Sequence, residues 1–106
     1  MTVSNTLGSG FLEKVYENAL AIELRKNGMT VTQQRAVRIF YEGFIVGDYM
    51  ADLIVNSNII VELKTAKVID TIHEAQMLNY LRAAKMRIGL ILNFGTPKMG
   101  IRRMIV

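Results

Sequence analysis

The sequence predicts one α/β (α+β) domain over residues 1–106, with the element order α, β, β, β, α, β and a short extra strand at the C-terminus. Two observations predict this fold class. Helical periodicity over residues 11–26 and 71–85 flanks a stretch of β-forming residues over 31–66, which short turns interrupt. The apolar share of 51% and the charged share of 21% are typical of a folded chain with one core.

The first predicted helix covers residues 11–26 and ends before Gly28. At 100° per residue, its apolar side chains form one arc. Glu13 falls between Leu20 and Leu24, at the margin of this arc rather than on the polar side. The arc consists of Leu12, Tyr16, Ala19, Leu20 and Leu24.

Three strands are predicted next, and they form an antiparallel meander. A turn at Glu42-Gly43 joins the first two strands, and the second continues past a bulge at Gly47. Residues 56–58, Asn-Ser-Asn, form a short turn before the third strand. The three strands cover residues 31–41, 44–55 and 59–66.

The second predicted helix begins at Asp70 or Thr71 and ends near Lys85. Thr71 and Glu74 have the spacing of a capping box. Two further strands are expected over residues 87–94 and 101–106, separated by Gly95-Thr96-Pro97.

Composition limits the chemistry that the chain can carry. The absence of cysteine excludes disulfides, thiolate nucleophiles and thiolate metal sites. A net charge of +4 and a pI near 9.6 favour a polyanionic partner such as nucleic acid. No apolar run approaches the roughly 20 residues that cross a bilayer, and residues 1–10 lack the features of a signal peptide. We therefore expect a cytoplasmic protein without a membrane partner.

One face of the third predicted strand carries a carboxylate and an ammonium group. Glu62 and Lys64 are two residues apart, so they point to the same face of an otherwise apolar strand. If residues 56–58 form a three-residue loop, Asp52 lies opposite Glu62 on the neighbouring strand. A two-residue turn would instead oppose Asp52 to Leu63 and send Glu62 to the other face, so the site depends on the register.

Carboxylates that face each other repel unless they share a proton or bind a cation. An all-oxygen ligand set suits Mg²⁺ or Mn²⁺. Such a cation polarises a phosphoryl oxygen and lowers the pKa of a bound water, while Lys64 can position that water or stabilise developing charge. The pattern therefore predicts hydrolysis of a phosphodiester bond.

These residues resemble a known signature. Asp52, nine intervening residues and then Glu62-Leu63-Lys64 resemble the D…(D/E)-x-K signature of PD-(D/E)XK nucleases. The resemblance implies a restriction-endonuclease-like core, in which helices flank a mixed central sheet.

Two further motifs resemble one family of this kind. Residues 10–16, from Gly10 to Tyr16, are similar to the motif that gives the GxxExxY protein family its name. Residues 73–76 followed by Tyr80 are similar to its second-helix motif, and the resemblance extends from about residue 7 to 106. Members of the family usually carry more residues before this stretch, so the resemblance implies a shortened N-terminus.

The resemblance also implies roles for individual residues. Asp52 and Glu62 would ligate the metal, with Glu13 as an accessory acid and third ligand. Lys64 would serve the attacking water, and Gln76 would support the active centre. The implied partner is nucleic acid, above all DNA, and cutting both strands would require a homodimer or two encounters. Candidate nucleic-acid contacts are Tyr80, Arg102 and Arg103.

Each candidate also has an ordinary structural interpretation. Glu62 and Lys64 can form an ion pair on an edge strand, and Glu13 can be a plain helix acid. Gln76 can be the polar edge of a packed helix, and His73 is expected to cap the helix or face solvent rather than act in catalysis. The arginines can simply form a solvated face. The competing function is a module that binds nucleic acid or another partner and keeps the fold without cleavage.

Overall fold

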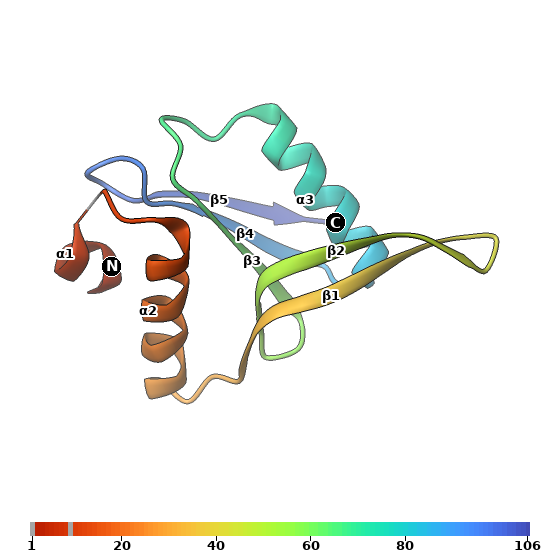
Figure 1. The fold of residues 1–106 in the computed structure, drawn as a ribbon, viewed down its shortest axis with the longest axis horizontal. Helices are drawn as coiled ribbons and strands as arrows, with labels where there is room; N and C mark the ends of the chain where they lie inside the picture. The colour runs from red at the N-terminus through yellow and green to blue at the C-terminus, as the bar shows by residue number, and fades with distance from the viewer. Residues whose placement is uncertain (1, 9) are drawn as a thin grey trace.

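The computed structural model describes residues 2–8 and 10–106 and contains a mixed five-stranded sheet with the strand order β1-β2-β3-β4-β5 (Figure 1). β3 and β4 are parallel neighbours, and the pairs β1-β2, β2-β3 and β4-β5 are antiparallel. The predicted fold class is confirmed, and so is the predicted element order from α2 onward. The elements are α1 (Thr2–Leu7), α2 (Glu13–Lys26), β1 (Val31–Tyr41), β2 (Phe44–Val55), β3 (Ile59–Lys64), α3 (Thr71–Ala84), β4 (Ile88–Asn93) and β5 (Gly100–Ile105).

Alternate residues of β3 fill two apolar clusters, one on each face of the sheet. Val61 packs in the cluster that contains Leu20 of α2. Ile60 packs in the cluster that contains Met77 and Leu81 of α3. Neighbouring residues of a strand point to opposite faces, so the two long helices cover opposite faces of the sheet.

The short helix α1 was not predicted. It packs against α2, and its Val3 is buried in the same cluster as Leu20. A helix of six residues is too short for its periodicity to be recognised, because it holds only two apolar residues, Val3 and Leu7. In the part of the chain that the structure describes, no helix is long and apolar enough to span a membrane.

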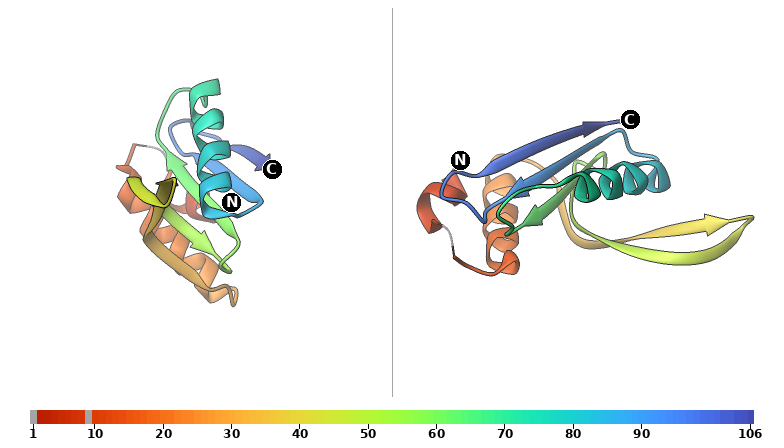
Figure 2. Two further views of the ribbon diagram at one scale, coloured as in Figure 1. Left: turned by 90° about the vertical axis from the view of Figure 1, so that its right-hand side faces the viewer. Right: turned by 90° about the horizontal axis from the view of Figure 1, so that it is seen from above.

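β1 and β2 extend beyond the rest of the sheet as a two-stranded arm, which projects in both Figure 1 and Figure 2. Ile39 pairs with Gly47 but Phe40 pairs with Ile45, which leaves Val46 as the extra residue. The predicted bulge at Gly47 is therefore wrong by one position. The exposed apolar side chains near the tip are Phe40, Tyr41, Phe44, Ile45 and Val46.

The loop between β2 and β3 has the three residues predicted for it. Val55 pairs with Ile59, and Leu53 pairs with Val61. The alternative register, with a two-residue turn, is therefore excluded. The pairing ends at Leu53, so Asp52 and Glu62 are the first positions beyond it.

The capping box of α3 differs from the predicted one. Asp70 is the N-cap residue, and its side chain accepts hydrogen bonds from the backbone of Ile72 and His73. The His73 side chain in turn accepts from the Asp70 backbone at 3.4 Å, so the box joins Asp70 to His73 rather than Thr71 to Glu74. The predicted pair was wrong because the helix begins at Thr71, which makes His73 the third helical residue.

The chain after β3 is held by a side chain of β4. Asn93 accepts from the N–H of Ala66 at 3.0 Å and donates to its carbonyl oxygen at 2.8 Å. These bonds satisfy the backbone of Ala66 outside a strand, so β3 ends at Lys64 rather than at the predicted residue 66. Gly95 lies against the same segment, where an added Cβ would be 2.3 Å from the Ala66 oxygen.

Candidate functional site

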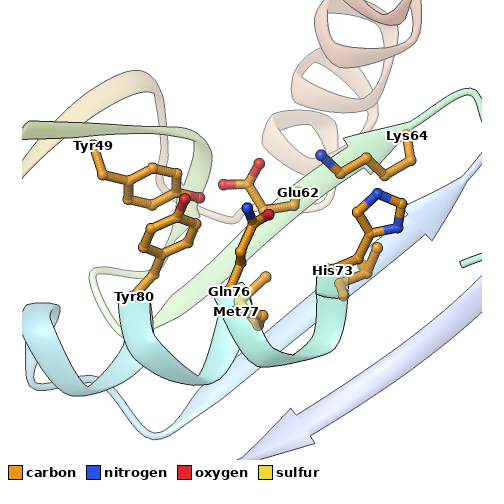
Figure 3. Close-up of a pocket in the computed structure, with 8 residues that line it drawn as sticks. Tyr49, Glu62, Lys64, His73, Gln76, Met77 and Tyr80 are labelled. Carbon is orange, nitrogen blue, oxygen red and sulfur yellow. The ribbon is translucent and has the colours of Figure 1, made fainter. Parts of the chain in front are cut away.

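The candidate site is a pocket between β3 and α3 (Figure 3). Glu62 and Lys64 point into it from the same face of β3, as the two-residue spacing predicted. Its volume of about 70 Å³ holds a few waters or a hydrated ion but no nucleotide, so a larger substrate would meet these groups at the mouth. The other lining residues are Tyr49, His73, Gln76, Met77, Tyr80 and Ile91.

Glu62 has a carboxylate oxygen with unused hydrogen-bonding capacity. Its Oε1 is buried and finds no hydrogen-bond partner among the described residues. Burial raises the pKa of the Glu62 carboxyl to about 7 from an ordinary 4.5, against the lowering effects of the Asp52 backbone and the Lys64 ammonium. The negative charges of Glu13 and Glu17 raise it further. A buried carboxylate oxygen without a hydrogen-bond partner is unfavourable, and a proton or a cation relieves it.

Asp52 lies on β2 at a break in the regular alternation of side chains. Ala51 and Leu53 would share a face in a regular strand, yet Ala51 packs on the α3 side and Leu53 on the α2 side. The Asp52 carboxylate lies at this break, where Oδ2 accepts from the Leu63 backbone at 2.9 Å. Oδ1 accepts from the Gln34 side chain at 3.3 Å. Asp52 is not among the residues that line the pocket.

Glu13 lies at the start of α2, close to the C-terminal end of β3. It is exposed, and its Oε2 accepts a hydrogen bond of 3.4 Å from the Thr65 hydroxyl. Its negative charge helps to raise the pKa of Glu62, but Glu13, Glu62 and Asp52 do not lie close enough together to form one metal site. Over residues 2–8 and 10–106, no group of three or more acidic, histidine or cysteine side chains is arranged to hold a metal.

The carboxylate oxygens present fit a divalent cation that is held by two protein side chains rather than by three or more. Mg²⁺ prefers oxygen ligands and commonly keeps several waters while binding one or two carboxylates. The buried Glu62 Oε1 atom accepts no hydrogen bond from any residue that the structure describes, and the Asp52 oxygens retain lone pairs beside their hydrogen bonds. Asp52 and Glu62 are therefore the residues that suit such an ion.

Residues from α3 and β2 cover one end of the pocket. The Gln76 amide points toward the Glu62 carboxylate in Figure 3. Tyr80 stacks on Tyr49, with ring centroids 3.4 Å apart and planes 9° from parallel. The Tyr49 hydroxyl is buried without a hydrogen-bond partner in the described part of the chain. Sequence reasoning missed Tyr49, because regular alternation puts residues 49 and 52 on opposite faces.

Glu17 is a second residue that the sequence interpretation missed. Its side chain is 3% exposed, and it accepts hydrogen bonds from Lys14 at 2.9 Å, Gln33 at 2.7 Å and Gln34 at 2.6 Å. Burial alone would raise the pKa of the Glu17 carboxyl, but these bonds together hold it below its usual value. A helical wheel could have found it, since Glu17 falls beside Leu24 in the apolar arc.

The tyrosine of the first-helix motif has a structural role. Tyr16 is fully buried, and its ring stacks on Phe94 with centroids 4.4 Å apart. Its hydroxyl donates to the carbonyl oxygen of Gly8 at 2.7 Å and accepts from the Phe11 N–H at 3.2 Å. Tyr16 thus ties the segment before α2 to the core.

The two arginines of β5 do not share a surface. Adjacent residues of a strand point to opposite faces, so Arg102 and Arg103 cannot contact the same phosphate group side by side. Arg102 forms an ion pair of 3.3 Å with Glu74 of α3, on the side of the sheet that carries the pocket. Arg103 is exposed on the other side.

Comparison with protein families gives one match. The chain matches the family model described as the PD-(D/E)XK nuclease superfamily over residues 1–104. Comparisons with curated proteins and with solved structures returned no match. The family match covers nearly the whole chain, and the mixed sheet flanked by helices agrees with it. The chain therefore belongs to the PD-(D/E)XK nuclease superfamily.

Proposed function

We propose that this chain is a metal-dependent nuclease that hydrolyses phosphodiester bonds of DNA, and that residues 1–106 form one catalytic domain of the GxxExxY type. The observation that carries the proposal is the Glu62 carboxylate. It lies beside Lys64 in a pocket, with one buried oxygen that has no hydrogen-bond partner among the described residues and a pKa raised to about 7. Asp52 occupies the neighbouring position on β2.

Asp52 and Glu62 hold the cation in this proposal, with Mg²⁺ or Mn²⁺ as the ion. The bound cation would supply positive charge that polarises the phosphoryl group. Lys64 carries its ammonium group into the same pocket, where it orients the attacking water or stabilises negative charge on the phosphate. Gln76 orients the Glu62 carboxylate, toward which its amide points in Figure 3. Glu13, which accepts a hydrogen bond from Thr65, acts as an accessory acid.

The proposed substrate is met at the mouth of the pocket. Tyr80 is stacked on Tyr49 there and offers an aromatic surface for a base. Arg102 lies on the same side of the sheet as α3, so it is better placed for a phosphate contact than Arg103. A chain without cysteine is compatible with the reducing cytoplasm, and cleavage of both strands would use a homodimer or two encounters.

The decisive experiment is cleavage of labelled single-stranded, duplex and branched DNA with Mg²⁺, Mn²⁺ or EDTA. The chain supplies a matched control for each substitution. Asp52→Asn is compared with Asp48→Asn, an exposed acid on the same strand, and Lys64→Ala with Lys67→Ala, an exposed lysine outside the pocket. We expect metal-dependent cutting that falls at least about 100-fold in Asp52→Asn and Lys64→Ala and persists in both controls.

Either other result would change the assignment. Cutting that survives Asp52→Asn and Lys64→Ala would mean a contaminating nuclease or a different site. A folded native chain that binds DNA but cuts none of the substrates with either metal would favour the non-catalytic binding module.

A further inference from the structure

One side chain connects the buried acid of α2 with the acid of β2. Gln34 of β1 donates its Nε2 amide to Glu17 Oε1 at 2.6 Å and to Asp52 Oδ1 at 3.3 Å. Both acceptors are carboxylates, which offer only lone pairs when they are ionised. The NH₂ end of the Gln34 amide must therefore face both of them, and its orientation is defined by chemistry.

The backbone at Gln34 is also unusual. Its φ of 51° lies in the left-handed region, which residues with a Cβ rarely adopt. Gln33 pairs with Leu53 and Arg35 with Ala51, but Gln34 and Asp52 are left out of the pairing between β1 and β2. The break in both strands turns the Gln34 side chain and the Asp52 carboxylate toward each other. Such strain persists where the surrounding contacts hold it in place.

Glu17 supplies those contacts. It is almost completely buried, its pKa is held below the usual value, and it accepts from Gln34 and also from Lys14 and Gln33. A fixed anion of this kind holds the Gln34 amide more firmly than solvent would. The amide in turn contacts the Asp52 carboxylate on the oxygen that Leu63 does not use.

We infer that Gln34, anchored by Glu17, is a positioning residue that fixes the orientation of the Asp52 carboxylate. The inference rests on the proposed function, in which Asp52 is a ligand of the cation. The Leu63 N–H and the Gln34 amide hold the two carboxylate oxygens from different strands. Rotation of the carboxylate breaks both bonds, so the lone pairs that remain keep a defined direction. Residues that orient metal ligands in this way contribute strongly to affinity.

The test compares Gln34→Met with Gln33→Met. Both replace a glutamine that contacts Glu17 by a side chain of similar length without an amide, but only Gln34 contacts Asp52. The first readout needs no metal: hydrogen–deuterium exchange of the Leu63 amide, relative to the amides of β4, which report opening of the whole sheet. The second readout is Mn²⁺ affinity by calorimetry.

In Gln34→Met we expect Leu63 to exchange about tenfold faster relative to β4, and Mn²⁺ affinity to fall about tenfold. Gln33→Met should change both by less than about threefold. Gln34→Gly, which suits a left-handed backbone, should behave like Gln34→Met and serves if that variant folds poorly. Unchanged Leu63 exchange in a folded Gln34→Met or Gln34→Gly chain would overturn the inference. A native chain that binds no Mn²⁺ would contradict the proposed function, while Leu63 exchange would still decide whether Gln34 fixes Asp52.

Discussion

The backbone N–H of Leu63 donates a hydrogen bond of 2.9 Å to Oδ2 of Asp52. The pairing of β2 with β3 ends at Leu53 and Val61, so the Asp52 side chain takes the place of the next backbone acceptor. Asp52 therefore supports the sheet in addition to its proposed role toward a cation. Asp52→Asn retains a side-chain oxygen for the Leu63 bond, which makes it a better test of the charge than Asp52→Ala.

The raised pKa of Glu62 predicts a pH-dependent stability. Its folded value of about 7 lies above the ordinary 4.5, so the folded chain binds the proton more tightly than the unfolded chain. The stability that tighter proton binding contributes is fully present below pH 4.5 and is lost as the pH rises through 7. Without divalent cations, we expect the free energy of unfolding to fall by roughly 2–3 kcal/mol over that range.

Urea unfolding at a series of pH values measures this effect. Glu62→Gln stays uncharged, so it should flatten the decline between pH 4.5 and 7. Asp48→Asn, on the exposed arm, should leave the decline in place. An equally steep decline in Glu62→Gln would assign the pH dependence to another group.

A second prediction concerns protection by a cation. At pH 7.5 Glu62 is mostly ionised, so Mg²⁺ at ten times its dissociation constant should stabilise the fold by about 1.4 kcal/mol. At pH 5.5 a proton occupies the carboxyl group, and most of the stabilisation should disappear. Thermal unfolding with MgCl₂, against NaCl of equal ionic strength, measures the difference. Protection of equal size in Glu62→Gln would show that Mg²⁺ binds elsewhere.

Gly95 should tolerate no side chain. A Cβ there would lie 2.3 Å from the Ala66 oxygen and 2.6 Å from its nitrogen, and backbone atoms cannot move aside as a flexible side chain can. We expect Gly95→Ala to lower the free energy of unfolding by about 2–3 kcal/mol. Gly47→Ala is the control, since a Cβ at Gly47 meets nothing within 4 Å. Similar urea midpoints for the two variants would mean that the backbone after Lys64 can shift to accommodate the methyl group at little cost in stability.

The hydroxyl of Tyr16 should contribute to stability apart from its ring. Tyr16→Phe keeps the stacking on Phe94 but removes the bonds to Gly8 and Phe11, so we expect a loss of about 1–2 kcal/mol. Tyr41→Phe changes an exposed tyrosine of the arm and should alter stability by less than about 0.5 kcal/mol. Chemical denaturation of both variants gives the comparison, and a neutral Tyr16→Phe would mean that solvent replaces both bonds.

The sequence was sufficient where local rules decide the structure. The three-residue loop and the apolar alternation of β3 determine the register of the hairpin, and with it the shared face of Glu62 and Lys64. The position of Glu13 beside Thr65 is a tertiary contact between distant segments. Periodicity could not distinguish Glu13 from any other acid at the margin of a helix, and only the family motif favoured it.

The remainder of the site depends on departures from regular geometry. The break at Asp52, opposite the left-handed Gln34, shifts the alternation of side chains between the two halves of β2, and this places Tyr49 on the face of the pocket. A sequence pattern based on two-residue alternation contains no signal for such a break. Arg102 and Arg103 show the converse case, since alternation alone would have assigned them to opposite faces.

The short loop between β2 and β3 has a consequence for the order in which the site assembles. Three residues separate these strands, whereas residues 65–87 separate the parallel strands β3 and β4. Loop-closure entropy favours the hairpin by about 2 kcal/mol over the long crossover. Formation of the hairpin, which has the smaller entropy cost, therefore brings Asp52 and Glu62 near each other. Gln76 and Tyr80 join the site only when the segment between β3 and β4 folds. A substitution that unfolds this segment would therefore remove Gln76 and Tyr80 from the site but leave Asp52 and Glu62 on their paired strands.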